Sequence, residues 1–246
     1  MAMRNIKLII AYDGSSYHGW QRQPDADTIQ QQIEDAGQKL FGEKISVTGS
    51  SRTDAGVSAL GQVASFNVDS AVPTENIARA LNGSLDEKIA VVSAEEVDED
   101  FNAIRSTKGK LYRYSICTSQ IRPVLDIKHC WHYPYKLGAS QMDIAAKLLV
   151  GKKDFKSFAS AADTRQSSVR TIISCKVFQE GDWIHIEVEG DGFLYNMVRN
   201  IAGTLVEIGR GRWAPEIITE ILAAKDRTVA GPLAPAYGLC LVRIDY

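Results

Sequence analysis

The pattern of apolar and polar positions along the chain predicts strands and helices in mixed order. Short apolar or alternating runs predict extended segments at residues 5–12, 44–48, 62–68, 89–97, 110–117, 170–180, 183–189 and 239–245. Helical spacing of apolar residues predicts helices between residues 28 and 42, at 74–81, 140–150 and 193–208, with another opening at Pro215. Because strands and helices do not alternate strictly, the pattern favours an α+β fold with helices packed on a largely antiparallel sheet.

Local signals set several of these boundaries. Residues 28–31, Thr-Ile-Gln-Gln, are typical of a capping box, and Gly42 is placed to end the same helix as a C-terminal cap. Gly181 and Asp182 predict the turn of a hairpin between the segments 170–180 and 183–189. In the helix 140–150, the side expected to be buried carries Ile144, Ala145, Leu148 and Leu149.

The helix expected at residues 193–208 is apolar on nearly every face, which predicts that it is buried. Arg199 is the only charged residue between Asp191 and Glu207. A buried guanidinium needs a carboxylate or phosphate partner, because removing one member of a buried pair costs about 3–5 kcal/mol. Two readings stay open: a salt bridge of the core, or an arginine that keeps a catalytic carboxylate ionised.

Residues 49–56 form a polar loop of small residues between two expected strands, and they include Asp54. Its small neighbours, Ala55 and Gly56, would allow a ligand to approach the carboxylate closely. The same sequence is also a good turn, so these residues alone favour a structural Asx turn over catalysis.

Charge is distributed unevenly along a chain whose formal net charge is only −2. Residues 86–100 hold seven acidic residues and one lysine, whereas residues 103–125 hold five cations and no acid. The basic stretch could line an RNA-facing surface or be a solvated strand. On its strand, Tyr112, Tyr114 and Ile116 share one face, so a ring could stack on a base while Lys110 and Arg113 engage phosphates; core packing explains the tyrosines equally well. The change of charge suggests a division into residues 1–104 and 105–246.

Several classes of protein are excluded by missing signals. The sequence has no phosphate-binding P-loop, dinucleotide-binding, nucleophile-elbow or zinc-protease motif, which leaves a cofactor-free reaction as the remaining enzyme class. Its four cysteines form no C-x-x-C pair, and the ligands in residues 129–132 would point to opposite faces of an extended segment, so we expect no metal site and no disulfide framework. The apolar run at residues 8–11 is too short for a signal peptide or a membrane span, and we expect a soluble, cytoplasmic protein.

Five ordered segments together resemble the TruA family of tRNA pseudouridine synthases, over nearly the whole chain. They are residues 12–23 (YDGSSYHGWQRQ), 52–57 (RTDAGV), 110–114 (KLYRY), 191–201 (DGFLYNMVRNI) and 234–239 (APAYGL). The second resembles the active-site loop of the family, the third the segment with its active-site tyrosine, and the fourth its arginine helix.

The resemblance implies a pseudouridine synthase fold, in which two ferredoxin-like halves share a largely antiparallel mixed sheet. It implies an isomerase that converts uridine to pseudouridine at positions 38, 39 and 40 of the tRNA anticodon stem-loop, without a cofactor, as a homodimer that binds tRNA. Asp54 would be the nucleophile, Arg199 its partner and Tyr112 the ring on the uracil. Arg52, Lys110 and Arg113 would contact the RNA.

Four positions depart from the family pattern: Ser51 replaces a usual Gly, Ser58 a frequent His, Ile104 a usual Arg and Lys153 a common His. Arg105 could replace the arginine missing at 104 from the next position, although on a strand it would face the other way. The altered loop residues leave two rival functions: a synthase that acts on another RNA, and a noncatalytic RNA-binding protein.

Overall fold

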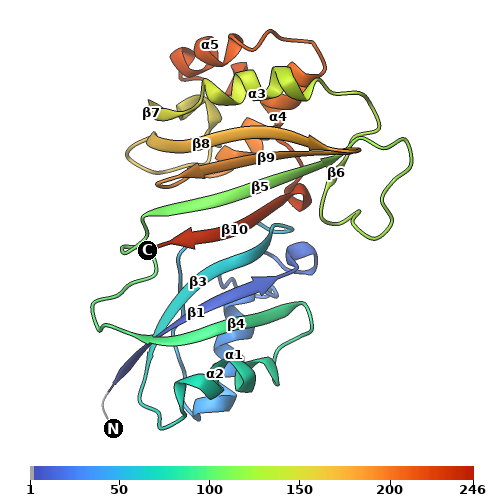
Figure 1. Cartoon of the computed structure of the whole chain (residues 1–246). Coiled ribbons are helices and arrows are strands. Elements are labelled where there is room, and N and C mark those ends of the chain that lie inside the picture. The colour runs from blue at the N-terminus through green and yellow to red at the C-terminus, as the bar shows by residue number, and fades with distance from the viewer. Residues whose placement is uncertain (1–2) are drawn as a thin grey trace. The chain divides into compact units, whose positions relative to one another are not determined.

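The structure is a computed structural model that describes residues 3–246. The chain folds into two compact units (Figure 1). Unit 1 comprises the described residues up to Lys108 together with Leu241–Tyr246, and unit 2 comprises Gly109–Cys240. The last strand of the chain therefore contributes most of its residues to the unit that also contains the first strand.

Unit 1 is an antiparallel sheet with two helices. The strands β4 (Ile89–Val97), β1 (Arg4–Tyr12), β3 (Ser58–Val68) and β10 (Leu239–Asp245) lie side by side in this order, and the short β2 (Thr48–Gly49) pairs with β3. The helices are α1 (Ile29–Phe41) and α2 (Thr74–Asn82), which pack against each other. Alternate residues of β1 are fully buried, as expected for a strand with one face on the core. The succession β1-α1-β2-β3-α2-β4 is the ferredoxin-like one.

Unit 2 repeats that succession up to its second helix, with two short strands added. Its sheet has the order β5 (Gly109–Cys117), β9 (Trp183–Gly190), β8 (Val169–Glu180) and β7 (Gly151–Asp154), and β6 (Trp131–His132) pairs with β5. The helices are α3 (Ala139–Lys147), α4 (Met197–Gly209) and α5 (Ile217–Ala224). Short 3-10 helices lie at Gly14–Ser16, Lys156–Phe158, Arg227–Val229 and Ala236–Gly238.

The α+β class and the largely antiparallel strand pairing are confirmed. The segments 89–97 and 239–245 are strands with the expected bounds, the hairpin turns at Gly181, and Gly42 caps α1 in the left-handed conformation, with φ 74°. The last long helix begins at Met197 rather than at residue 193, because Asn196 before it has a φ of 62°.

Three local expectations are wrong. Thr28 precedes α1 but makes no capping bond; the amides of Ile29 and Gln30 donate instead to the carbonyl oxygens of Gly19 and Trp20. Residues 44–47 form no strand, and only Thr48–Gly49 pairs with β3. In α3 the side chain of Ile144 is 46% exposed, since the buried positions are Met142, Ala145 and Ala146.

Candidate functional site

The loop that carries Asp54 lies between β2 and β3 in unit 1 and is fixed at both ends by backbone hydrogen bonds. The Ser50 amide donates to the Val63 carbonyl oxygen at 2.8 Å, and the Val57 amide donates to the Asp54 carbonyl oxygen at 3.1 Å. Asp54 itself is half-buried. A turn therefore exists here, closed by the main-chain carbonyl of Asp54, and a catalytic role for its carboxylate stays a prediction.

Two buried polar side chains of the neighbouring strands hold the middle of the loop. The Gln62 side chain, fully buried in β3, donates to the Ser51 carbonyl oxygen at 2.6 Å and accepts from the Ser51 amide at 3.2 Å. The Tyr12 hydroxyl, at the end of β1, lies 2.7 Å from the Thr53 hydroxyl. Because these groups are buried, losing one partner would leave the other unsatisfied at a cost of about 1–3 kcal/mol.

The segment that follows β1 packs directly on the loop. The Trp20 amide donates to the Thr53 carbonyl oxygen at 3.0 Å. A side-chain carbon at Gly14 would overlap the Val57 carbonyl oxygen, and one at Gly19 would lie 2.6 Å from the Thr53 carbonyl oxygen, so glycine is required for this close approach. The sequence alone did not identify residues 12–20 or Gln62 as supports of Asp54. For residues 12–20, the glycines and aromatic residues were the signal that could have predicted close packing.

Ser58, one of the departures from the family pattern, takes part in the same packing. Its hydroxyl oxygen accepts a hydrogen bond of 3.1 Å from the Gly14 amide. Arg52 lies in the same loop, between Ser51 and Thr53, and its side chain is exposed. Its expected contact with RNA stays a prediction.

Tyr112 lies on β5 in unit 2, opposite Val188 of β9, and is 6% exposed. Its ring meets that of Phe193 edge to face, with the ring centroids 5.3 Å apart. Alternation along the strand places Lys110 and Tyr114 on the same face. Tyr114 has a structural role: its hydroxyl donates to the Pro235 carbonyl oxygen at 2.9 Å, and burial raises its pKa, which keeps the hydroxyl protonated.

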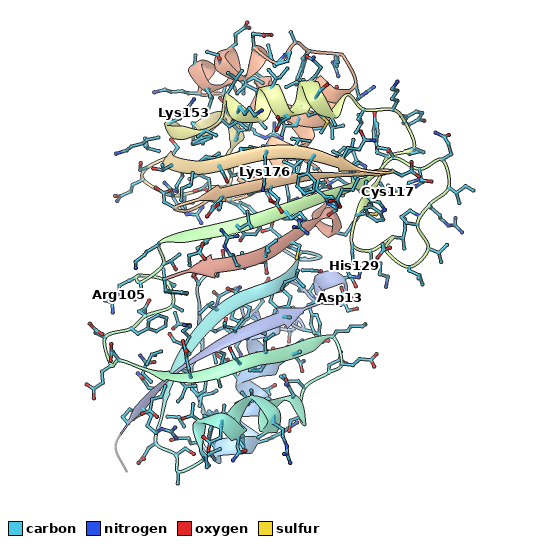
Figure 2. The ribbon with its side chains drawn as sticks, in the orientation of Figure 1. Asp13, Arg105, Cys117, His129, Lys153 and Lys176 are labelled. Atoms are coloured by element: carbon cyan, nitrogen blue, oxygen red, sulfur yellow. The ribbon has the colours of Figure 1, made fainter. Side chains whose placement is uncertain are left out.

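Arg113 points to the opposite face of β5 and is held in an ion pair. Its guanidinium donates to Glu187 of β9 at 2.7 and 3.0 Å, and Lys176 of β8 (Figure 2) lies 3.0 Å from the same carboxylate. The Glu187 side chain is only 8% exposed, so it needs these cations. The expected phosphate contact of Arg113 stays a prediction, and its position away from the Tyr112 face does not support it.

Arg199 occupies the first turn of α4. Its Nε donates to the Ala234 carbonyl oxygen at 2.8 Å and its Nη1 donates to the Asn196 side-chain oxygen at 3.0 Å. In the next turn, a side-chain carbon at Gly203 would overlap the Pro232 carbonyl oxygen, so residues 230–234 lie tightly along the helix. The expected burial of this helix is confirmed, whereas the pairing of Arg199 with Asp54 stays a prediction.

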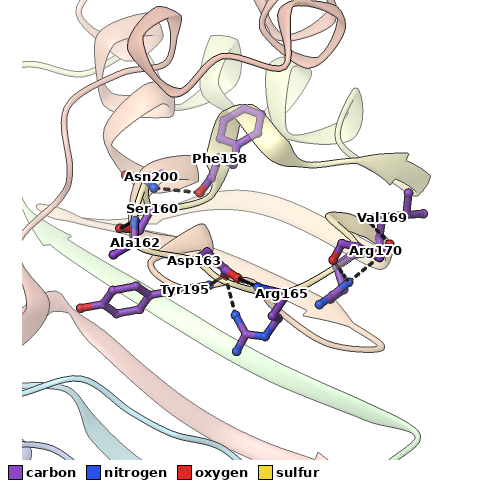
Figure 3. Close-up of polar contacts among 10 residues, drawn as sticks. Phe158, Ser160, Ala162, Asp163, Arg165, Val169, Arg170, Tyr195 and Asn200 are labelled. Atoms are coloured by element: carbon purple, nitrogen blue, oxygen red, sulfur yellow. Dashed lines mark hydrogen bonds and ion pairs between the residues drawn. The ribbon is translucent and has the colours of Figure 1, made fainter.

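The loop after the short 3-10 helix Lys156–Phe158 is hydrogen-bonded to Tyr195, just before α4 (Figure 3). The Asp163 carboxylate accepts hydrogen bonds from the Tyr195 amide at 2.6 Å and the Arg165 amide at 2.9 Å, and pairs with the Arg165 guanidinium. The Ser160 amide donates back to the Tyr195 carbonyl oxygen at 2.9 Å. Burial by itself raises the pKa of Asp163, but the two amides and the Arg165 guanidinium together outweigh it, and the pKa lies below its ordinary value. An ionised Asp163 thus holds the turn that precedes Arg199.

Lys110 is close enough to Arg165 for the two cations to repel each other. Burial, and then the Arg165 charge, lower the pKa of Lys110 to about 8. Arg165 is itself paired with Asp163. The expected phosphate contact of Lys110 stays a prediction.

The two remaining departures lie away from these residues. Ile104 is 55% exposed, and Arg105 lies in the exposed segment before β5 (Figure 2). The Lys153 ammonium donates to the Leu148 carbonyl oxygen at 2.6 Å, which caps the end of α3. Lys153 therefore serves the local fold.

The candidate residues are divided between the units. Asp54 and Arg52 belong to unit 1, and Lys110, Tyr112, Arg113 and Arg199 belong to unit 2. Within residues 3–246, no group of three His, Cys, Asp or Glu side chains could hold a metal ion. No helix in the same range has the length and the apolar surface to cross a membrane.

The family model and the relatives that match this chain carry the same family name. A family model described as tRNA pseudouridine synthase matches residues 8–104 and 145–246. The chain is 46% identical to tRNA pseudouridine synthase A 2 of Clostridium perfringens and 45% identical to tRNA pseudouridine synthase A of Caldicellulosiruptor saccharolyticus, in each case over 99% of this chain and 100% of the relative. A solved Cbf5-Nop10-Gar1 complex aligns over 96% of this chain and 57% of that chain, with 11% identity and a TM-score of 0.33.

Proposed function

Since this chain belongs to the tRNA pseudouridine synthase family, we propose that it isomerises uridine to pseudouridine at positions 38, 39 and 40 of the tRNA anticodon arm. The observation that carries the proposal is the support around Asp54. Residues from β1, β3 and the segment after β1 hold the loop by buried hydrogen bonds and glycine contacts. Such a rigid setting is what a reacting carboxylate requires.

The reaction breaks the N-glycosidic bond, turns the detached uracil and joins its C5 to the ribose, so the product is an isomer of the substrate. No electron is gained or lost: C5 loses a proton, and N1, released from the ribose, gains one. Asp54 supplies the carboxylate with which each of three routes begins: attack on the base, attack on the ribose, or removal of a ribose proton. The target nucleotide first leaves its stack, at a cost of a few kcal/mol.

Tyr112 and Arg199 complete this set of residues. Tyr112 lies with its ring edge against Phe193, so its position is fixed, and in the proposal it packs on the uracil and relays the C5 proton. In the proposal Arg199, held by Asn196 and Ala234, pairs with the Asp54 carboxylate.

In the proposal, RNA contacts come from Arg52 in unit 1 and Lys110 in unit 2. Arg52 is exposed beside the nucleophile, where it can grip the backbone or fill the space of the displaced base. Lys110, on the same face of β5 as Tyr112, contacts a phosphate. The functional form is a cytoplasmic homodimer that binds tRNA, as in the family.

A synthase for another RNA and a noncatalytic RNA-binding protein are the rivals. To discriminate them, the purified protein is incubated with unmodified tRNA transcripts and with ribosomal RNA fragments, and pseudouridine is located by base-specific chemical labelling. Pseudouridine at positions 38 to 40 of tRNA supports the proposal. Product only in ribosomal RNA establishes the first rival, and RNA binding without product in either substrate establishes the second.

A further inference from the structure

The C-terminal end of α4 has an arrangement of charges that the proposed reaction does not use. Glu207 is 3% exposed, yet it bears a carboxylate. The Arg210 Nη1 donates to one of its oxygens at 2.8 Å, and the Arg212 Nη1 donates to the other at 3.1 Å. One buried acid therefore holds two arginines.

These arginines present most of their donors to solvent. Their side chains are 47% and 64% exposed. Each guanidinium has five N–H groups in a fixed plane, and within residues 3–246 neither makes a side-chain hydrogen bond other than the one to Glu207. The pair carries a net charge of about +1 after Glu207 is counted, with its donors already oriented.

The backbone after the helix is shaped to bring the second arginine back. Gly211 has a φ of 75°, in the left-handed region that favours glycine, and the Arg212 amide donates to the Glu207 carbonyl oxygen at 3.1 Å. The Arg212 guanidinium lies over the Trp213 ring, 5.6 Å from its centroid. The chain thus folds Arg212 onto the same carboxylate that Arg210 already neutralises.

Aromatic rings lie beside this pair. The Gly138 amide donates to the Gly209 carbonyl oxygen at 2.7 Å, which ties the segment after β6 to the helix end. In that segment the rings of Tyr133 and Tyr135 meet edge to face at 5.3 Å, and Tyr135 is 65% exposed. Tyr133 is near enough to Arg210 to interact with its charge.

A purely structural role accounts for only one of the arginines. Burial of the Glu207 carboxylate demands one cation, and the end of a helix favours a positive charge by about 0.3–1 kcal/mol. Arg210 alone meets both needs. A second, more exposed arginine on the same acid, lying over the Trp213 ring, is the arrangement that nucleic-acid backbones bind: oriented guanidinium groups for phosphate oxygens and a face for a sugar or base.

We propose that Arg210 and Arg212 form a phosphate-binding site for the RNA backbone, with the ring of Trp213 beside it. The proposal rests on the proposed function in that the RNA is a tRNA. Along α4, Arg210 lies about 16 Å from Arg199 at 1.5 Å per residue, so the phosphate bound here belongs to a nucleotide several positions away from the target uridine. The site therefore contributes to affinity for the RNA and leaves the chemical step alone.

The test compares wild type with Arg210→Gln, Arg212→Gln and the double variant, using an unmodified tRNA transcript. Binding is measured over a range of salt concentrations, and kcat and KM are measured for pseudouridine formation. For one phosphate contact the slope of log affinity against log salt decreases by about 0.7–0.9 in the double variant. KM rises by about tenfold, while kcat stays within twofold.

Three controls accompany the variants. Arg79→Gln removes an exposed arginine from the last turn of another helix, α2, and leaves the slope unchanged. Thermal unfolding checks that the variants are folded, and Arg212→Lys, which keeps the charge and the contact with Glu207, restores most of the affinity. Inorganic phosphate is titrated against the wild type to separate a site for a free anion from a site for RNA.

Folded variants with an unchanged salt slope and KM would overturn the inference, as would saturation by inorganic phosphate with no loss of RNA affinity in the variants. A fall in kcat at unchanged KM would also overturn it. If the wild type binds tRNA with the arginine-dependent slope but makes no pseudouridine, the proposed function fails while the binding site stands.

Discussion

The two units hold their candidate residues by different means. In unit 1, Asp54 lies on a loop without regular backbone pairing, held by Tyr12, Trp20 and Gln62 from elements far apart in the sequence. In unit 2, Tyr112 lies in the middle of a paired strand and Arg199 in the first turn of a buried helix. Regular secondary structure therefore places the proposed partner residues Tyr112 and Arg199, whereas the position of the proposed nucleophile Asp54 depends on close contacts between irregular segments.

Removing the Tyr112 hydroxyl should lower activity more than the other variants below, although it leaves the packing of both units unchanged. In Tyr112→Phe the ring stays against Phe193, so RNA affinity is unchanged, while loss of the proton relay lowers kcat by about 10²–10⁴-fold. Single-turnover kinetics with a tRNA transcript measure this. A variant as fast as wild type would leave Tyr112 with stacking alone.

The close packing in unit 1 can be broken without touching a reacting group. Gly14→Ala places a carbon against the Val57 carbonyl oxygen and forces the Asp54 loop to shift. A displacement of about 1 Å costs about 10²-fold in rate, with a stability loss of about 1–3 kcal/mol. Activity and urea unfolding are measured together.

Gly83→Ala is the matched control, since the added carbon would lie 3.4 Å from the Ala80 carbonyl oxygen, an ordinary contact. It should leave activity unchanged. If Gly14→Ala also left activity unchanged, the Asp54 loop would not depend on the close packing of Gly14 against Val57, and the contrast between the units would not hold.

In unit 2, Asp163 holds the turn before Arg199, and its substitution should lower activity less than Gly14→Ala does. Asp163→Ala leaves the Tyr195 amide and Arg165 without their acceptor but keeps α4 itself, so we expect about a tenfold fall in kcat and about 1–3 kcal/mol lower stability. Asp163→Asn retains an acceptor for the amide and should recover most of the activity. An effect of Asp163→Ala as large as that of Gly14→Ala would argue that both units depend equally on loop contacts.

The smallest predicted effect concerns pH. Lys110 has a pKa of about 8, lowered by burial and by Arg165, so it is protonated at pH 7 and largely neutral at pH 9. RNA affinity should therefore fall severalfold over this range, and Lys110→Arg should remove the dependence because arginine stays charged. Filter binding at constant ionic strength measures it, and an affinity that does not change with pH would exclude a charge contact by Lys110.

Periodicity predicted the regular parts of the molecule well. The bounds of β4 and β10, the hairpin turn at Gly181 and the buried α4 follow from local sequence, since each depends on alternation, turn residues or an apolar surface. The capping of α1 could not be predicted in this way. Its free amides are satisfied by the carbonyl oxygens of Gly19 and Trp20, and only the tertiary structure brings that segment to the helix.

In the candidate site, too, the residues themselves could be predicted from the sequence, whereas their tertiary contacts could not. Asp54, Tyr112 and Arg199 came from residue types and family motifs, but the hydrogen bonds of Gln62 and Asp163 depend on pairs of distant residues that no local pattern connects. The RNA contact of Arg113 stays a prediction. Its charge and its place beside Tyr112 suggested an RNA contact, yet the alternation of the strand turns it toward Glu187.

Pseudouridine formation by Asp54→Asn tests the central claim most directly. Asparagine keeps the size of the side chain and removes the negative charge, so the account predicts no pseudouridine at positions 38 to 40 of a tRNA transcript while RNA affinity and thermal stability stay near those of wild type. Product formed by this variant at the wild-type rate would contradict the assignment of Asp54 as the nucleophile.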